Sequence, residues 1–173
     1  MKTAEQLRHA MEQFGPAIER FLRSRLISQH TTEDIYQEVF EIYYTSDCIF
    51  ENPLHLKRWL FKTASNRCKQ HFRKASTQRE HLFDPAMDRS SLSLHCLDDH
   101  RQPDFSEDHF IWDYVAALTP DQRECIYLYY VEGYRTAEIA EITQSNSATV
   151  RTRLRRARQA LKKALKGGKY ELR

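Results

Sequence analysis

An acidic stretch without helical periodicity divides this chain into two parts that do have it. Residues 80–108 mix Pro, Ser and Asp, and they carry eight acidic side chains against two basic ones. Like charges at this density oppose collapse into a core, and turn-forming residues interrupt any regular helix. We therefore predict a flexible acidic linker at 80–108 between two small domains, residues 1–79 and residues 109–173.

Composition favours helices in both flanking segments. The 173 residues include only four Gly and five Pro, and 29% of them are charged. Few turn formers and many solvated side chains are typical of small helical domains. The predicted fold class is therefore all-α, with two small helical domains joined by the linker.

Net charge hides an asymmetry along the chain. The whole sequence carries +3, but residues 1–79 carry +4, residues 80–108 carry −6 and residues 109–173 carry +5. Two basic segments flanking an acidic one are a better indication of a polyanionic partner than the small total.

The N-terminal sequence and the cysteines indicate the compartment. The first residues, MKTAEQLRHAMEQF, are polar and amphipathic, and no apolar run reaches the roughly 18 residues of a membrane span. The four cysteines, Cys48, Cys68, Cys96 and Cys125, are scattered and form no CxxC pair. We predict a cytoplasmic protein with reduced thiols.

Apolar spacing predicts helices in the N-terminal segment. Leu7, Met11 and Phe14 indicate a first helix, which the pair Gly15-Pro16 is expected to interrupt so that Pro16 begins a second one. A third helix is expected over residues 32–44, capped by a hydroxyl of Thr31-Thr32 and carrying Glu33 and Asp34 in its first turn. A fourth is expected from about residue 56 to residue 72.

The C-terminal segment has the plan of a helix-turn-helix. Helices are expected over residues 110–117, over 120–131 with Thr119 as its cap, and over 136–142. The turn TQSN then leads to a long helix over 147–166, which Gly167-Gly168 ends. A short helix, a four-residue turn and a longer helix are typical of DNA-binding helix-turn-helix domains.

The last helix is strongly basic on its outward side. Its predicted buried stripe is Val150, Leu154, Ala157, Leu161 and Leu165, and Arg151, Arg155, Arg158 and Lys162 lie one position later. Nine Lys and Arg and no acidic residue occur from Arg151 to Lys169. The helix dipole disfavours cations near the helix start, and a bound polyanion would offset this unfavourable charge. The predicted DNA contacts of this domain are Thr136, Ser147, Thr149, Arg151, Thr152, Arg153, Arg155, Arg156 and Arg158. Thr136 is also expected to cap its helix and to present backbone N–H groups to a phosphate.

Three motifs of this segment resemble the fourth conserved region of extracytoplasmic-function (ECF) sigma factors of the sigma-70 family. They are Leu118-Thr119-Pro120, Glu138-Ile139-Ala140-Glu141 and the run from Thr149 to Leu154. In that family this domain reads the minus-35 promoter element. The turn departs from the family, because Gln144 stands where Gly is usual and Ser145 where an apolar residue is usual. We expect a reshaped turn and a missing buried anchor, which leaves the base contacts open.

The N-terminal segment resembles the second region of the same family. Glu33-Asp34-Ile35 and the run Gln37 to Phe40 are similar to the acidic helix that docks on the largest polymerase subunit. The resemblance implies polymerase-binding roles for Asp34, Gln37, Glu38 and Glu41.

The following helix resembles the part of the family that melts and reads the minus-10 element, through Trp59-Leu60-Phe61 and the run His71 to Lys74. Its expected DNA contacts are Lys57, Arg58, Trp59, Lys62, Asn66, Arg67 and Arg73. Basic groups would follow the phosphates, and Asn66 with the loop 47–55 would line the pocket for a flipped base. For Trp59, packing is the favoured role over base stacking.

The resemblance implies an alternative sigma factor that directs promoter-specific initiation. The implied partners are core RNA polymerase through its largest and second-largest subunits, promoter DNA and an anti-sigma factor. Contact with a membrane is expected only through that last partner. The linker would thread the RNA channel of the polymerase.

Other interpretations remain open at this point. A free-standing helix-turn-helix regulator would bind duplex DNA without polymerase, and a helical adaptor would bind protein only, through residues 40–44. His95, Cys96 and His100 are zinc-ligand types, but they lack a second cysteine pair. No catalytic constellation occurs, so we predict a protein that is not an enzyme and has neither cofactor nor metal.

Overall fold

The computed structural model describes residues 1–25, 28–80 and 114–167, and every regular element in these ranges is a helix. The chain separates into two compact units, Met1–Arg101 and Gln102–Arg173. The predicted all-α class is confirmed. None of the helices that the structure describes has the length and apolarity needed to cross a membrane. The predicted linker, apart from Glu80, and the residues His95, Cys96 and His100 lie outside the described ranges.

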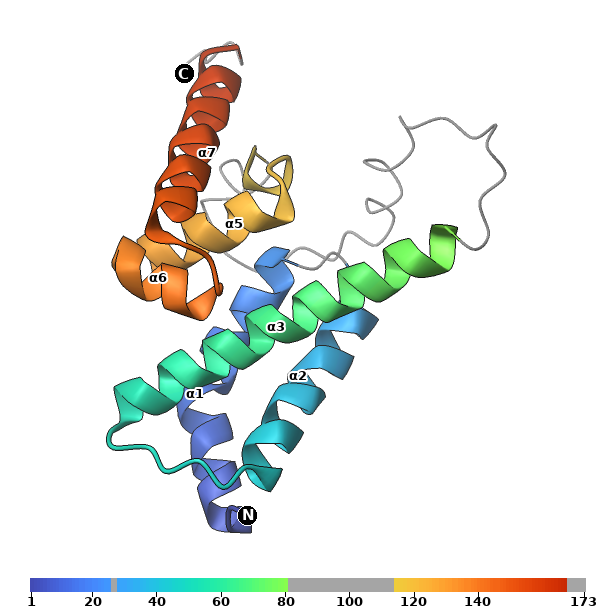
Figure 1. Ribbon diagram of the computed structural model, residues 1–173, viewed down its shortest axis with the longest axis vertical. Coiled ribbons are helices and arrows are strands. Elements are labelled where there is room, and N and C mark those ends of the chain that lie inside the picture. Colours follow the sequence, from blue (N-terminus) through green and yellow to red (C-terminus); the bar gives the residue numbers. More distant parts are fainter. Residues whose placement is uncertain (26–27, 81–113, 168–173) are drawn as a thin grey trace, which may run out of the picture. The chain divides into compact units, whose positions relative to one another are not determined.

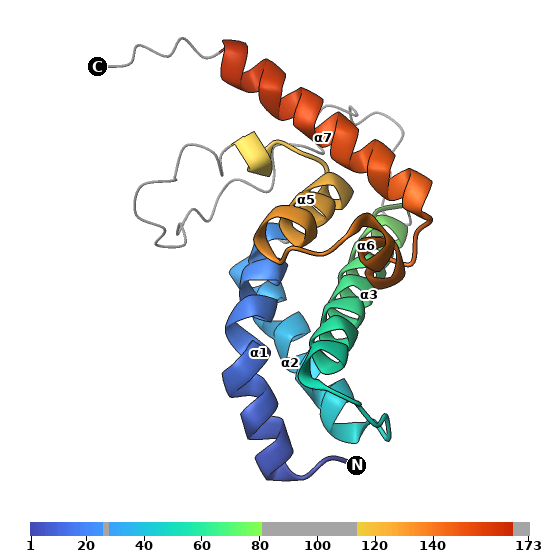
Figure 2. The ribbon, with the colours of Figure 1, turned by 90° about the vertical axis from the view of Figure 1, so that its left-hand side faces the viewer.

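The first unit is a bundle of three helices, α1 (Ala4–Arg25), α2 (Gln29–Thr45) and α3 (Pro53–Glu80), each packed against the other two (Figures 1 and 2). At its centre the rings of Phe21 and Phe61 meet edge to face, with centroids 5.2 Å apart. The surrounding core is aliphatic and fully buried: Ile18, Leu22, Val39, Leu60 and Ala64.

The interruption predicted at Gly15-Pro16 was wrong, because α1 runs through both residues without a break. Phe14 and Ile18 are buried on either side of the pair, and their packing outweighs the roughly 3 kcal/mol cost of an interior proline. Gly15 itself allows a close approach to α2. A Cβ atom at this position would lie 2.5 Å from the hydroxyl oxygen of Tyr36.

The starts of α2 and α3 also differ from the predictions. Ser28, not Thr31 or Thr32, caps α2, since its side chain accepts a hydrogen bond from the Thr31 N–H at 3.4 Å. Thr32 Oγ1 instead donates to the Ser28 carbonyl at 2.9 Å. Asn52 Oδ1 accepts from the His55 N–H at 2.8 Å, and α3 begins at the next residue, Pro53.

The end predicted for α3 at residue 72 was too early. The apolar stripe stops at Phe72, but the sequence RKASTQRE that follows contains no Gly or Pro, so the helix continues to Glu80. Its last residue lies just inside the segment that we assigned to the linker.

The second unit contains α5 (Pro120–Ile126), the π-helix η2 (Tyr127–Val131), α6 (Thr136–Ile142) and α7 (Ser147–Gly167). Thr119 forms the predicted cap, and Gln122 completes a capping box. The predicted helix over 120–131 is thus continuous but changes from α to π geometry. The helix predicted over 110–117 falls only partly within the described residues, where 114–116 are helical.

Packing in the second unit follows the predicted stripe of α7. Val150, Leu154 and Ala157 are buried against α5 and α6, whereas Leu161 and Leu165 are half-buried. Leu128, Ile139 and Ile142 complete this core. Both α5 and α6 pack against α7, so its position within the domain is set by contacts with each of them.

Candidate nucleic-acid interface

The turn between α6 and α7 keeps the geometry that a glycine would favour. Gln144 adopts φ 50°, in the left-handed region. The Ser145 N–H bonds to the Ala140 carbonyl at 2.9 Å, and the Gln144 N–H bonds to the Glu141 carbonyl at 3.4 Å. These two bonds define a Schellman motif, which satisfies carbonyls at the helix end. The predicted reshaping of the turn was therefore wrong. The two backbone hydrogen bonds keep Gln144 in the left-handed conformation despite its steric cost.

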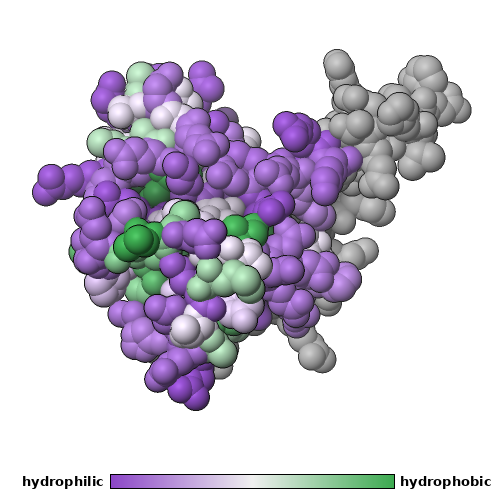
Figure 3. All heavy atoms as spheres, turned by 60° about the horizontal axis from the view of Figure 1, so that its bottom comes forward, coloured by the Kyte–Doolittle hydropathy of each residue, from purple (hydrophilic) through white to green (hydrophobic). Residues whose placement is uncertain are grey.

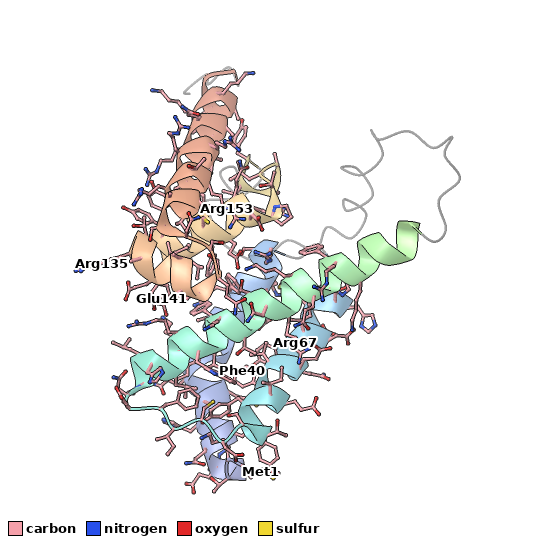
Figure 4. All side chains as sticks on the ribbon, in the orientation of Figure 1. Met1, Phe40, Arg67, Arg135, Glu141 and Arg153 are labelled. Carbon is pink, nitrogen blue, oxygen red and sulfur yellow. The ribbon has the colours of Figure 1, made fainter. Side chains whose placement is uncertain are left out.

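Two capping interactions fix the helix starts around this turn. Asn146 caps α7, because its Oδ1 accepts from the Thr149 N–H at 2.7 Å. At α6 the cap is Arg135, whose N–H donates to Glu138 Oε2 at 2.9 Å. The prediction that Thr136 caps this helix was wrong, because the Glu138 carboxylate accepts its hydrogen bond from Arg135, the residue before Thr136. Arg135 projects away from the start of α6 (Figure 4).

The exposed face of α7 carries most of the predicted DNA contacts. Arg151, Arg155 and Arg156 are exposed, and Thr152 is half-buried beside them. Ser147 and Thr149, in the first turn, are also half-buried. The buried stripe opposite holds this face toward solvent, so three guanidinium groups and a hydroxyl are available to one ligand.

Arg153 and Arg158, which were predicted to contact DNA, are engaged within the unit. Arg153 lies between α7 and α5 (Figure 4), with its Nη2 2.5 Å from Asp121 Oδ2. Its Nη1 donates to Ser145 Oγ at 3.0 Å. Arg158 is exposed, but its guanidinium lies over the rings of Tyr129 and Tyr130, 5.3 and 5.6 Å from their centroids.

One face of α3 gathers the predicted strand-binding residues of the first unit. Arg58, Lys62, Asn66 and Arg73 recur at helical spacing and so share this face. Lys62 and Arg73 are exposed, whereas Arg58 and Asn66 are half-buried. Lys57 lies to the other side, with its Nζ 5.9 Å from the centre of the Phe61 ring.

The side-chain amide of Asn66 is available to a ligand. No residue in the described ranges forms a hydrogen bond with it, although it is half-buried. An amide in this position carries two donors and one acceptor oxygen, which is the complement that a nucleobase edge requires.

Trp59 packs in an aromatic cluster near the start of α3. Its ring lies 5.5 Å from Phe50 and 6.3 Å from Tyr43, both edge to face. Burial raises the pKa of the Tyr43 hydroxyl. These contacts agree with the packing role favoured from the sequence, and they place the loop residue Phe50 against the helix.

Sequence reasoning missed the N-terminal residues that hold this loop. Lys2 Nζ donates to the Cys48 carbonyl and lies 5.2 Å from the Phe50 ring centre, and the Lys2 N–H bonds to the Tyr44 carbonyl at 2.9 Å. The Met1 ammonium lies 2.7 Å from Asp47 Oδ1 and lowers the pKa of that carboxyl. Contacts across 46 residues have no local signal in a sequence.

The acidic face of α2 adjoins the basic helix α3. Asp34, Gln37, Glu38 and Glu41 are all exposed and share one side of α2. Glu38 Oε2 lies 3.6 Å from Arg67 Nε, so the structure brings together two residues that were assigned to different partners. Arg67 is half-buried and also donates to Gln70 at 2.9 Å.

Most of the described surface is hydrophilic in the view of Figure 3, with apolar groups confined to small patches. In the loop before α3 and the first turn of that helix, Ile49 and Leu54 are strongly exposed, at 88% and 66%. The polar surfaces that the structure describes are thus an acidic face on α2, a basic face on α3 that includes the Asn66 amide, and a basic face on α7 in the other unit.

Comparisons with known proteins place both units in one class. The Sigma-70 region 2 model matches residues 10–78, and the Sigma-70 region 4 model matches residues 111–161. The ECF RNA polymerase sigma factor SigK of Mycobacterium sp. (strain KMS) is 30% identical over 155 residues, covering 86% of this chain and 75% of that protein. SigK of Mycolicibacterium vanbaalenii is 32% identical, covering 86% of this chain and 74% of that protein.

Two solved structures share the fold. The sigma factor RpoE from Bartonella quintana, solved with the anti-sigma factor NepR, has a TM-score of 0.70 at 22% identity and covers 96% of this chain and 100% of that one. CnrH, solved with the cytosolic domain of CnrY, has a TM-score of 0.62 at 20% identity, with coverages of 96% and 91%.

Sigma-70 regions 2 and 4 on successive helical units define the class as an RNA polymerase sigma factor. More particularly, the chain belongs to the ECF sigma factor family. Its function is that of an alternative sigma factor in transcription initiation. The interpretations as a free-standing regulator or a protein-only adaptor are thereby set aside.

Proposed function

We propose a division of labour among three helix faces. The α2 face with Asp34, Gln37, Glu38 and Glu41 docks on core RNA polymerase. The α3 face with Arg58, Lys62, Asn66 and Arg73 captures the opened minus-10 strand. The α7 face with Arg151, Thr152, Arg155 and Arg156 enters the major groove of the minus-35 element.

One observation carries this proposal: an exposed acidic face and an exposed basic face lie on adjoining helices of one unit. A DNA-binding regulator would lose affinity by keeping four acidic or amide side chains beside its phosphate contacts. A subunit that must bind a protein and a nucleic acid together has a use for both faces.

Promoter reading follows from the chemistry of the two basic faces. Arginine at a groove-facing position can donate two hydrogen bonds to guanine O6 and N7, and the Thr152 methyl can contact thymine. On α3 the cations would follow single-strand phosphates while the Asn66 amide pairs with the edge of a flipped base. These roles need no covalent chemistry, and we propose that the protein is not an enzyme.

The remaining expectations belong to the same proposal. The chain acts in the cytoplasm, and an anti-sigma factor that covers both domains holds it inactive. Support comes from RpoE, which was solved with the anti-sigma factor NepR, and from CnrH, which was solved with the cytosolic domain of CnrY. The domain boundaries at 79 and 109 are proposed from composition and charge, and the passage of residues 80–108 through the polymerase RNA channel is proposed on the resemblance alone.

The docking face is tested with the full chain and core polymerase. Reversing two charges, in the double variant Asp34→Lys and Glu41→Lys, should weaken binding to core polymerase by about tenfold, because complementary charges at an interface become repulsive. The matched control reverses Glu5 and Glu12, which are exposed on α1. Equal loss in both double variants, or no loss in either, would contradict the assignment of α2.

A further inference from the structure

The end of α6 lacks the apolar contact that accompanies a Schellman motif. In such a motif the residue after the left-handed position commonly packs an apolar side chain onto the last turns of the helix. Here that residue is Ser145, which is half-buried, and the residues it would cover, Ile139 and Ala140, are buried. A polar contact can therefore take this place at the turn and act together with the packing of α7 on α5 and α6.

Arg153 supplies that contact. Its Nη1 donates to Ser145 Oγ at 3.0 Å, and the same hydroxyl donates to the Thr143 carbonyl at 3.3 Å. On the other side, Nη2 lies 2.5 Å from Asp121 Oδ2 in the first turn of α5. One planar guanidinium thus connects the turn, α7 and the start of α5.

The surroundings of this bridge distinguish it from a surface ion pair. The side chains of Arg153 and Asp121 are 24% and 42% exposed, so both are partly removed from water. Charge-assisted bonds made with a planar donor fork are directional as well as strong. Asp121 is itself fixed, because Thr119 and Pro120 cap and begin α5.

We propose that Arg153 is a positioning residue for promoter recognition. The bridge formed by Asp121, Arg153 and Ser145 sets the angle of α7 and thereby decides which bases Arg151 and Arg155 meet. This inference rests on the proposed role of α7 in reading DNA, and it removes Arg153 from the DNA contacts predicted from the sequence.

If Arg153 instead contacted a phosphate directly, the substitution Asp121→Asn would change DNA binding in the opposite direction. Removing an acidic group close to bound DNA should tighten DNA binding if charge alone mattered. Loss of a positioning bridge should weaken it. Asp121→Asn therefore separates the two roles by the sign of its effect.

The test uses holoenzyme assembled from the full chain and core polymerase. A duplex pool, randomised at the upstream element, is enriched with wild-type holoenzyme, and one enriched duplex and its scrambled version are the probes. We expect Asp121→Asn to weaken binding of the enriched duplex by about tenfold, the loss expected for one charge-assisted hydrogen bond. Affinity for the scrambled duplex should hardly change, so the ratio of the affinity for the enriched duplex to that for the scrambled duplex should fall.

Salt dependence provides the second measurement. The slope of log affinity against log salt should be the same in Asp121→Asn, Arg153→Lys, Arg153→Met and the wild type, because no phosphate contact is lost. Arg156→Met, which removes an exposed cation, is the contrast and should reduce the slope by about one. Arg153→Lys keeps the charge without the fork, so it should lower the affinity ratio as Asp121→Asn does.

Each outcome bears on the proposal. Unchanged or tighter binding by Asp121→Asn, or a reduced salt slope in Arg153→Met, would overturn it while leaving the role of α7 intact. If wild-type holoenzyme enriches no sequence, the proposed role of α7 fails and the inference fails with it. Ser145→Ala, which removes one contact only, replaces any variant whose helical signal shows that it does not fold.

Discussion

The two basic helices, α3 and α7, differ in how their cations are surrounded. On α3, Arg67 is paired with Glu38, Lys57 lies against the Phe61 ring, and half-buried Asn66 stands among exposed cations. On α7, Arg151, Arg155 and Arg156 project into solvent from a stretch that contains no acidic residue. The first helix combines charge with aromatic and amide groups, whereas the second presents arginine almost alone.

This difference fits two forms of DNA. An opened strand exposes base faces and edges, so its capture needs aromatic surface and hydrogen-bonding groups as well as charge. A closed duplex exposes only base edges in the groove and phosphates along it, for which arginine is sufficient. The segments before the two helices are also held differently, one by the N-terminal residues Met1 and Lys2 and the other by Arg153.

The largest effect should come from reversing a charge on α7. We expect Arg151→Glu to reduce transcription from a cognate promoter by about a hundredfold, because a groove contact is replaced by repulsion from phosphates. Binding to core polymerase should be unchanged, which a pull-down measures alongside multi-round transcription in vitro. Arg20→Glu, on the exposed side of α1, is the control. Full promoter use by Arg151→Glu would remove α7 from the proposed interface.

A smaller effect, confined to strand opening, should follow from Asn66→Ala. Loss of the amide should slow open-complex formation by about tenfold while recruitment of holoenzyme to closed promoter is retained. A template with a pre-opened minus-10 bubble should restore part of the loss, as followed by permanganate footprinting. Gln13→Ala provides an exposed amide deletion on α1 for comparison. Equal loss of recruitment and opening would show that α3 acts before melting, which contradicts a role of Asn66 in strand capture.

The smallest effect concerns the loop before α3. Because the Met1 ammonium lowers the pKa of Asp47, their ion pair stabilises the fold above the ordinary carboxyl pKa of about 3.9 and is lost as pH falls through the lowered value. The wild type should have a slightly higher melting temperature than Asp47→Asn at pH 6, and the two melting temperatures should become equal at pH 2. Glu51→Gln, which removes another carboxyl group from the same loop, is the control. A constant difference at all pH values would contradict the ion-pair explanation.

Much of the architecture could be predicted from sequence because it depends on local signals. The capping box at Thr119, the bounds of α6 and the buried stripe Val150, Leu154 and Ala157 all follow from residues within a few positions of each other. One error arose where a distant contact overrode a local preference. Pro16 should break a helix, yet the core around Phe14 and Ile18 keeps α1 continuous.

The candidate interface shows the same division. Spacing alone indicated that α7 has a buried face and an arginine face, and motif order indicated the family. Spacing places Arg151 and Arg153 on different sides of the helix, but it names no partner for either arginine. Only the fold shows that Asp121, thirty-two residues earlier, occupies one of them.

By itself the sequence determined an all-α chain with helix-turn-helix patterning, a basic last helix and the sigma-factor motifs, since these depend on helical periodicity and residue type. Tertiary structure decided which cations face outward, how Gln144 adopts a left-handed turn, and what replaces the apolar anchor at Ser145. The physical reason is the range of the interactions. Periodicity acts within a few residues, whereas a side chain such as Arg153 finds its partners only after distant segments have been brought together by the core.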